Sequence, residues 1–297
     1  MRSKGGGGRP DMMPLLDRTR GLLRRFDLRP RKGLGQHFLV DGEVLEDIVS
    51  AAGLAPGDVI VEVGPGLGIL TAELVKLAGR VVAVEYDARL ASALEDVFAD
   101  SPNLQVRNMS ALEFDPAGLP PGYKVVANLP YYVASPIIRH FLETSHKPGR
   151  MVVMVQKEVG DSMVAAPGRM SLLGVSVQYY GRPTLVRYVS RKGFYPPPEV
   201  DSALVSIDVY PAPQVDVPDV GRFFSVVRAG FSARRKQLHN ALARGFGIST
   251  YEIAELLEKT GIDHRRRAQT LSIEEWAAVS RALISCESHE CNDTGIC

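Results

Sequence analysis

The stretch "VIVEVGPGLGILTAEL", residues 59–74, decides the fold class. It begins with an apolar, β-branched run typical of a buried strand, and it ends in residues that repeat with the period of a helix. Between them stand three glycines, Gly64, Gly66 and Gly68. Glycines at such a junction allow a tight turn and let the backbone approach a ligand at the C-terminal edge of a sheet. The stretch therefore predicts a strand–loop–helix unit with a ligand over the loop, and a plain turn without a ligand is the alternative.

The spacing of these glycines indicates the kind of ligand. A dinucleotide fingerprint has its third glycine at the position that Ile69 occupies in this chain. The acidic residue Glu62 precedes the loop, and a carboxylate suits S-adenosylmethionine, with its sulfonium and ammonium groups, better than a pyrophosphate. Glu85 ends the next apolar run, where an acidic side chain can accept hydrogen bonds from ribose hydroxyls. We therefore predict S-adenosylmethionine as the cofactor and disfavour a nucleotide-dependent oxidoreductase.

Short apolar runs continue along the chain on the C-terminal side of this unit. The predicted strands of the series are 59–64, 81–85, 104–108, 124–128 and 151–156. Helix-period segments lie between several of them, for example 69–77 and 136–145. This alternation predicts an α/β fold with a Rossmann-like, doubly wound and mostly parallel sheet. Two later runs, 185–190 and 202–209, have no long helix between them and predict a closing hairpin.

The chain is expected to have four parts. These are a basic, partly disordered N-terminal extension (1–30), the α/β domain (31–210), a small helical domain (217–285) and a flexible tail (286–297). The extension includes a short amphipathic helix within 14–29, and its arginines are either a solubilising feature or an RNA-contacting arm. The helical domain follows a Pro-rich linker and holds 11 Lys and Arg residues against 7 Asp and Glu residues. Its helix-period segments are 220–230, 234–244, 250–259 and 272–284.

Composition excludes several classes of protein. The 297 residues are 45% hydrophobic and 23% charged, and the formal net charge is only +1, so local clusters must provide any attraction to nucleic acid. No apolar stretch approaches the roughly 20 residues that span a bilayer. The cysteines Cys286, Cys291 and Cys297 all lie near the C-terminus, which excludes a disulfide scaffold and favours a cytoplasmic location. They lack a paired C-x-x-C spacing, so we expect free thiols and no metal site.

The stretch "NLPYYVASP" (128–136) follows another predicted strand, so Asn128 projects into the crevice above the cofactor. Its amide offers an acceptor and donors without charge, Pro130 stiffens the turn, and Tyr131 supplies a flat face for stacking. Phe194 is a candidate for a second ring. These parts suit methyl transfer to the exocyclic amine of a nucleobase that has left its stack. An ordinary turn is the alternative, and a core position is the alternative for Phe194.

Two basic clusters lie in the helical domain. Arg234, Arg235 and Lys236 open one predicted helix, and residues 265–267 are three consecutive arginines. Contact with RNA phosphates is the interpretation that we favour for these clusters, and a solvated helix face is the alternative.

Five motifs, taken together, resemble the ribosomal RNA adenine N6,N6-dimethyltransferase family. They are "KGLGQHFL" (32–39), "EVGPGLGILT" (62–71), "NLPYYVASP" (128–136), "FYPPPEVDSALV" (194–205) and "GFSARRKQLHNAL" (230–242), in the order that the family shows. The resemblance spans roughly residues 31–285 and is strongest to the small-subunit (16S) group. It implies a class I methyltransferase, monomeric, that dimethylates two adjacent adenines in a 3′-terminal hairpin loop of the rRNA of an immature small subunit.

The resemblance also implies roles for particular residues. Cofactor contacts carry over to His37, Leu39, Gly64, Glu85, Ser110 and Asn128. Many relatives have Asn where this chain has His37, and the family usually has Asp where this chain has Ser110, so these two contacts are expected to be weaker. The rivals are a non-catalytic rRNA-binding or assembly factor on the same fold and a large-subunit enzyme of the macrolide-resistance type. The intact Asn128, Pro130 and Tyr131 favour a catalyst.

Overall fold

The computed structural model describes residues 13–233 and 235–294. Its strands are β1 (Phe38–Leu39), β2 (Val59–Val63), β3 (Arg80–Glu85), β4 (Leu104–Asn108), β5 (Lys124–Asn128), β6 (Arg150–Gln156), β7 (Gly181–Val189), β8 (Phe194–Tyr195) and β9 (Ser202–Val209). Its helices are α1 (Leu15–Arg25), α2 (Gly42–Ala52), α3 (Thr71–Leu77), α4 (Ala88–Val97), α5 (Ala134–Glu143), α6 (Lys157–Met163), α7 (Leu172–Tyr180), α8 (Val220–Phe231), α9 (Leu238–Phe246), α10 (Thr250–Lys259) and α11 (Ile273–Thr294). The described residues form two compact units, one within Met1–Lys157 and Leu185–Ser206 and one within Glu158–Thr184 and Ile207–Cys297.

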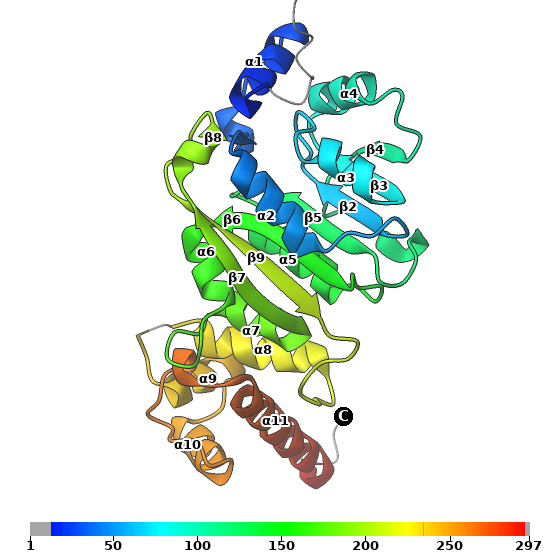
Figure 1. Ribbon diagram of the computed structural model, residues 1–297. Helices are drawn as coiled ribbons and strands as arrows, with labels where there is room; N and C mark the ends of the chain where they lie inside the picture. The colour runs from blue at the N-terminus through cyan, green and yellow to red at the C-terminus, as the bar shows by residue number, and fades with distance from the viewer. Residues whose placement is uncertain (1–12, 234, 295–297) are drawn as a thin grey trace, which may run out of the picture. The chain divides into compact units, whose positions relative to one another are not determined.

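Within the described residues, the main sheet has seven strands in the order β4-β3-β2-β5-β6-β9-β7 (Figure 1). Strands β2 to β6 pair in parallel, as the partners of Val61 illustrate, which are Val82 on β3 and Val125 on β5. The predicted Rossmann-like, mostly parallel fold is confirmed, and each of these five strands lies within one residue of its predicted bounds. The strand order reverses between β2 and β5, which is the topological switch point where open α/β sheets bind ligands.

The central strands are buried on both faces because helices cover them, as is usual for parallel sheets. On β6, residues 151–155 are all buried. Helix α2 lies over β5 and β6 (Figure 1), and its Val44 and Ile48 join a hydrophobic cluster with Val126 and Met154. The Asp41 side chain accepts a hydrogen bond from the Val44 N–H and caps the start of α2. This packing fixes the C-terminal edge of the sheet, where the strand ends carry the polar residues.

Helix α1 confirms the expected amphipathic helix near the N-terminus. Its Leu23, together with Leu28, is buried in a second hydrophobic cluster with Phe38, Leu67 and Leu90. Residues 1–12, the first part of the expected disordered extension, lie outside the described residues. Among the helices that the structure describes, none is both long and apolar enough to cross a membrane.

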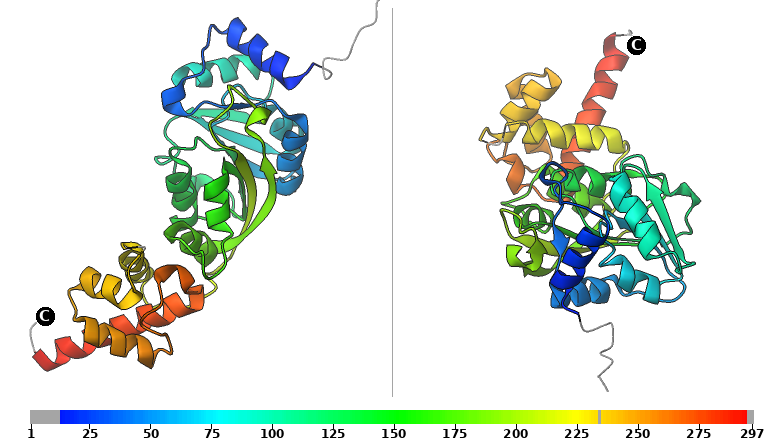
Figure 2. Two further views of the ribbon diagram at one scale, coloured as in Figure 1. Left: turned by 90° about the vertical axis from the view of Figure 1, so that its left-hand side faces the viewer. Right: turned by 90° about the horizontal axis from the view of Figure 1, so that it is seen from above.

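In the unit that includes α6 to α11, the helices pack around aromatic side chains (Figure 2, yellow to red for α8 to α11). Tyr179 of α7 stacks on Phe223 of α8 with ring centroids 4.9 Å apart. Trp276 of α11 is fully buried and lies 5.6 Å from the Phe231 ring. The stacked Tyr179 explains why Glu158–Thr184 groups with the C-terminal helices, whereas the sequence analysis placed these residues with the sheet.

The helices of this unit differ from their predicted bounds at two points. Helix α9 begins at Leu238 and not at 234, because the Lys236 N–H bonds to the Ala233 carbonyl in a turn and Gln237 is extended. Helix α11 continues to Thr294, so the backbone of 286–294 is helical where the sequence analysis expected a flexible tail. The last three residues lie outside the described part of the chain.

Candidate active site

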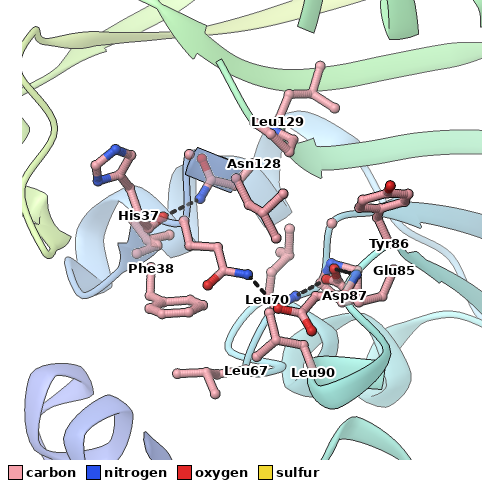
Figure 3. A pocket seen from close by; sticks show the side chains of 18 of the residues that line it. His37, Phe38, Leu67, Leu70, Glu85, Tyr86, Asp87, Leu90, Asn128 and Leu129 are labelled. Atoms are coloured by element: carbon pink, nitrogen blue, oxygen red, sulfur yellow. Dashed lines mark hydrogen bonds between the residues drawn. The ribbon is translucent and has the colours of Figure 1, made fainter. Parts of the chain in front are cut away.

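A pocket lies at the C-terminal ends of β2, β3 and β5 (Figure 3). Its lining comes from residues within four segments of the chain, 34–39, 62–70, 85–90 and 128–132, with Ile48 of α2 behind them. Because β2 and β5 flank the switch point of the sheet, the pocket occupies the place where doubly wound folds bind their ligands.

The glycine loop and Glu85 form one hydrogen-bonded wall of the pocket. Gly66 has a φ of +58°, and a Cβ at this position would lie 3.0 Å from the Phe38 ring, so a larger residue would be strained and crowded. The Gly66 N–H donates to Glu85 Oε2 at 3.1 Å, and the Asp87 N–H donates to Glu85 Oε1 at 2.9 Å. Burial raises the pKa of Glu85, and these backbone bonds partly oppose the rise. The carboxylate keeps acceptor capacity for ligand hydroxyls, because each oxygen has two lone pairs.

Glu62 is a buried acid at the base of the pocket, with only 1% of its surface exposed. Burial, and then the negative charge of Glu85, raise the pKa of Glu62 to about 8. Its Oε2 atom has no hydrogen-bond partner among the described residues. Burying a carboxylate without a partner costs free energy. A ligand with a positive charge or a hydrogen-bond donor at this position would remove that cost.

Apolar side chains line the part of the pocket below Glu85 and Asp87 in Figure 3. Phe38, Leu67 and Leu90 are all buried and belong to the cluster that includes α1. Such a lining has room for a flat, apolar ring system, and the acids beside it offer acceptors to the polar groups of a ligand.

Asn128 ends β5 and connects the strand to the segment that crosses the pocket. Its Nδ2 atom donates to the His37 carbonyl at 3.0 Å (Figure 3), and no other hydrogen bond of this side chain occurs among the described residues. The His37 ring stacks on Tyr131 with centroids 5.8 Å apart, and its Nδ1 atom bonds to the Pro196 carbonyl at 2.8 Å. The Tyr131 hydroxyl bonds to Ser202 Oγ at 2.5 Å. The carbonyl oxygen of the Asn128 amide is therefore left as an acceptor in a rigid setting.

Gln36 and Asp87 form a second polar connection across the pocket lining. Gln36 Nε2 donates to Asp87 Oδ2 at 3.1 Å, and Gln36 Oε1 accepts from the Arg31 N–H at 2.8 Å. Arg31 and Arg89 also lie within 3.5 Å of Asp87 Oδ2. Burial opposes ionisation of Asp87, but the hydrogen bonds from Gln36 and Arg89 outweigh it and lower the pKa. The segment before β1 is thus fixed to the start of α4.

Comparison with known families identifies the family to which a protein with this pocket and fold belongs. The profile of a family described as "Ribosomal RNA adenine dimethylase" matches residues 28–284. The chain belongs to the ribosomal RNA adenine dimethylase family. The predicted resemblance is therefore confirmed, and the chain is an rRNA adenine dimethyltransferase.

Individual relatives agree with the family assignment. A protein from Dehalococcoides mccartyi named "Ribosomal RNA small subunit methyltransferase A" is 49% identical over 265 residues, which cover 88% of this chain and 91% of the relative. A dimethyladenosine transferase from Plasmodium falciparum shares the fold, with a TM-score of 0.70 at 24% identity over 88% of this chain and 99% of that structure. The 23S rRNA methyltransferase ErmE gives a TM-score of 0.66 at 27% identity over 83% of this chain and 99% of that structure.

The pocket of this dimethylase brings together most of the residues singled out in the sequence. Those that line it are His37, Leu39, Gly64, Glu85, Asn128, Pro130 and Tyr131. Ser110 does not line it; it follows β4 and its Oγ atom accepts a hydrogen bond from the Leu112 N–H. Phe194 does not line it either, because this residue is 2% exposed and packs in the hydrophobic core beside its strand partner Leu39.

Sequence reasoning missed several residues of the dimethylase pocket. Gln36 and Asp87 carry no separate signal, although Gln36 stands inside the "GQHFL" motif and Asp87 is a recognisable helix N-cap. Of the predicted RNA-binding residues, Arg235 and Lys236 are exposed before α9, and Arg234 lies outside the described residues. In the second arginine cluster, Arg266 forms a two-bond ion pair with Glu275 and so serves the fold.

Proposed function

We propose that this dimethylase transfers methyl groups from S-adenosylmethionine to N6 of two adjacent adenines in a 3′-terminal hairpin loop of small-subunit rRNA. Its place would be the biogenesis of the small subunit in the cytoplasm, with the chain acting as a monomer on an immature particle. The relative at 49% identity, a small-subunit methyltransferase by name, supports the small subunit over the large one, because the 23S enzyme shares only 27%. The cysteine-free body of the chain supports the location.

The residues present fit the cofactor. S-adenosylmethionine, when bound, supplies an electrophilic methyl group on a sulfonium. The unpartnered oxygen of Glu62 suits a cationic ligand, and Glu85 can accept from ribose hydroxyls. Phe38, Leu67 and Leu90 offer the apolar surface that an adenine ring needs. We assign the cofactor contacts to these residues together with His37, Leu39, Gly64 and Asn128, and not to Ser110.

The observation that carries the proposal is the position of Asn128. The lone pair of adenine N6 is delocalised into the ring, so this nitrogen is a poor nucleophile and must be held in line with the methyl donor. The amide is fixed by its bond to the His37 carbonyl, so its own carbonyl oxygen can accept one N6 hydrogen, and a backbone carbonyl beside Pro130 can accept the other. Positioning of this kind supplies most of the rate in such reactions.

Tyr131 is proposed as the stacking surface for the extruded adenine. Its ring is oriented by the hydroxyl bond to Ser202 and by contact with His37, so it is held in place before the base arrives. Stacking on an aromatic ring offsets part of the cost of removing a base from its neighbours. Phe194 is buried and supports the site by packing behind Leu39.

A methyl-transfer assay on small subunits from cells lacking the enzyme tests the proposal. Labelled methyl incorporation is expected with the wild-type chain and is expected to fall at least about 100-fold in Asn128→Ala, because the target amine is no longer held. Asn103→Ala is the matched control, since the Asn103 amide also donates to backbone carbonyls, those of Val75 and Ala78, and none of these residues lines the pocket. Equally low incorporation by wild type and Asn128→Ala would favour the non-catalytic binding factor.

Two further measurements separate the remaining rivals. Mass-spectrometric mapping of rRNA from cells with and without the protein names the modified adenines, and modification of large-subunit rRNA alone would contradict the small-subunit assignment. Calorimetric titration with S-adenosylmethionine and, separately, with NAD distinguishes the methyltransferase from an oxidoreductase.

A further inference from the structure

A hollow rich in arginine lies on the helical unit, between α8 and the end of α9 (Figure 1 labels both helices). We call it the arginine hollow, and its polar and aromatic lining consists of Arg222, Ser225, Arg228, Ser232, Arg244 and Phe246. No charge run marks these residues in the sequence, because they are scattered over α8, its C-cap Ser232 and the end of α9.

The two helices approach each other closely at this point. A Cβ on Gly245 would lie only 2.6 Å from the Cβ of Ala229, so the helices can meet here only because residue 245 is glycine. Arg228 and Arg244 each precede one member of this contact pair, so both belong to the lining of one hollow. Residues 222, 225 and 229 of α8 and its C-cap Ser232 are three or four positions apart and share one face.

The chemistry of the lining favours an anion. None of the described residues that line the hollow carries a carboxylate. Arg228 Nη2 donates to Ser225 Oγ at 3.0 Å, and the guanidinium of Arg222 lies 4.4 Å from the centre of the Phe246 ring. The acid at the start of α8, Asp219, has an oxygen bonded to the Arg222 backbone N–H and caps the helix.

Arg228 and Arg244 bring two positive charges to the lining of the arginine hollow. Both are exposed, and neither has a carboxylate within ion-pair distance in the part of the chain that the structure describes. By contrast, four neighbouring cations are paired, as Arg182–Asp208, Lys259–Glu255, Arg265–Asp263 and Arg266–Glu275. Two unneutralised guanidinium groups in one hollow suit the oxygens of phosphate groups, to which arginine presents several donors in a fixed geometry.

We propose that the arginine hollow binds the phosphodiester backbone of the rRNA substrate. The inference rests on the proposed function, which supplies an RNA partner, and it assigns the contact to residues other than the predicted cluster at 234–236. Phosphate contacts set the register of a nucleic acid without reading its sequence, so the hollow positions the RNA and takes no part in the chemistry.

The test compares three forms of the full-length enzyme with wild type. The double variant Arg228→Ala, Arg244→Ala removes both charges, and Arg228→Lys, Arg244→Lys retains them. Arg182→Ala is the matched control, because Arg182 is an exposed arginine of the same unit that is paired with Asp208. The dissociation constant for small subunits lacking the modification, and for a hairpin RNA of the 3′-terminal sequence, is measured at several salt concentrations between about 50 and 200 mM.

In the double alanine variant we expect affinity for RNA to fall about tenfold or more at the lowest salt. The slope of log K against log salt should decrease by roughly one for each phosphate contact that is lost. The lysine variant should recover most of the slope, and cofactor affinity and turnover at saturating RNA should remain as in wild type. Thermal unfolding of each variant separates these effects from loss of the fold.

Two outcomes would overturn the inference, and they are distinguishable. If the alanine variant keeps the affinity and salt slope of Arg182→Ala while wild type binds and methylates RNA, the hollow is not an RNA site and the proposed function stands. If wild type binds no RNA under any of these conditions, the proposed function fails and the inference fails with it.

Discussion

Glu62 is an acid that the fold keeps protonated until a partner arrives. Its pKa of about 8 lies above the value of 4.5 that it has outside the protein. The native state therefore holds this proton more tightly than the unfolded state, and the stability of the protein falls as pH rises from 4.5 to about 8 and then levels off. We expect Glu62→Gln to lack this decline. The melting temperature of the variant minus that of wild type should therefore increase between pH 5 and pH 8.

Thermal unfolding of both proteins across this pH range measures the effect. Glu95→Gln, which replaces an exposed acid on α4, should give a curve parallel to that of wild type. A difference between Glu62→Gln and wild type that stays constant with pH would show that the buried carboxyl titrates near its ordinary value.

Gln36 is predicted to lower the rate at which the cofactor dissociates from the pocket. It holds the segment before β1 against Asp87, so its removal should free one wall of the pocket. We expect Gln36→Ala to weaken binding of S-adenosylhomocysteine about tenfold, mainly through faster dissociation, as measured by stopped flow. Arg89→Ala is the matched control, because Arg89 contacts Asp87 but does not line the pocket. Equal dissociation rates in the two variants would contradict this role.

The residues that the sequence predicted well are those at strand ends. Gly64, Glu85 and Asn128 each follow a readable apolar run, and the C-terminal ends of parallel strands meet at one edge. Ser110 follows β4 as predicted but does not line the pocket, and Phe194, a candidate for a second ring, packs in the core. The hydrophobic periodicity of the sequence gives no indication of side chains such as Gln36, which contacts Asp87 from a distant segment of the chain.

At the scale of elements, α1 is a structural support of the pocket that lies before the residues matched by the family profile. Its Leu23 packs in the cluster that includes Phe38, Leu67 and Leu90, which line the pocket. We expect Leu23→Ala to lower the free energy of unfolding by about 2 to 4 kcal/mol, because it leaves a cavity. Cofactor affinity should fall severalfold in calorimetric titrations at a temperature where the variant is folded.

The exposed Arg24 on the same helix supplies the control, since Arg24→Ala changes the charge of α1 without changing its buried face. If Leu23→Ala is destabilised but binds the cofactor as tightly as Arg24→Ala, then α1 supports the fold and not the site.

Elements with a clear period were predicted closely, and the others were not. The capping box of Ser249 and Glu252 and the apolar period fix α10 at its predicted bounds. The two-residue strands β1 and β8 pair Phe38 with Tyr195 across more than half of the chain, and a strand of two residues has no period to detect. The late start of α9 depends on a local turn that competes with the helix.

At the scale of the whole molecule, the site draws on segments far apart in sequence but within one unit. Hydrogen exchange with S-adenosylmethionine should therefore protect peptides covering 34–39, 64–70, 85–90 and 128–132 together. Peptides from α8 to α11 should show no change, and NAD should protect none of the four segments. Protection confined to one segment, or seen mainly in the C-terminal helices, would contradict the assigned pocket.

The helical unit is assembled from two separate stretches of chain, because Glu158–Thr184 groups with the residues after 206. A fragment that contains only the residues after the proline-rich segment lacks Tyr179. The face of Phe223 on which Tyr179 stacks would then be exposed to water. Such a fragment is therefore expected to aggregate. A helical unit that folds independently would need residues Glu158–Thr184 joined to the residues from Ile207 onward.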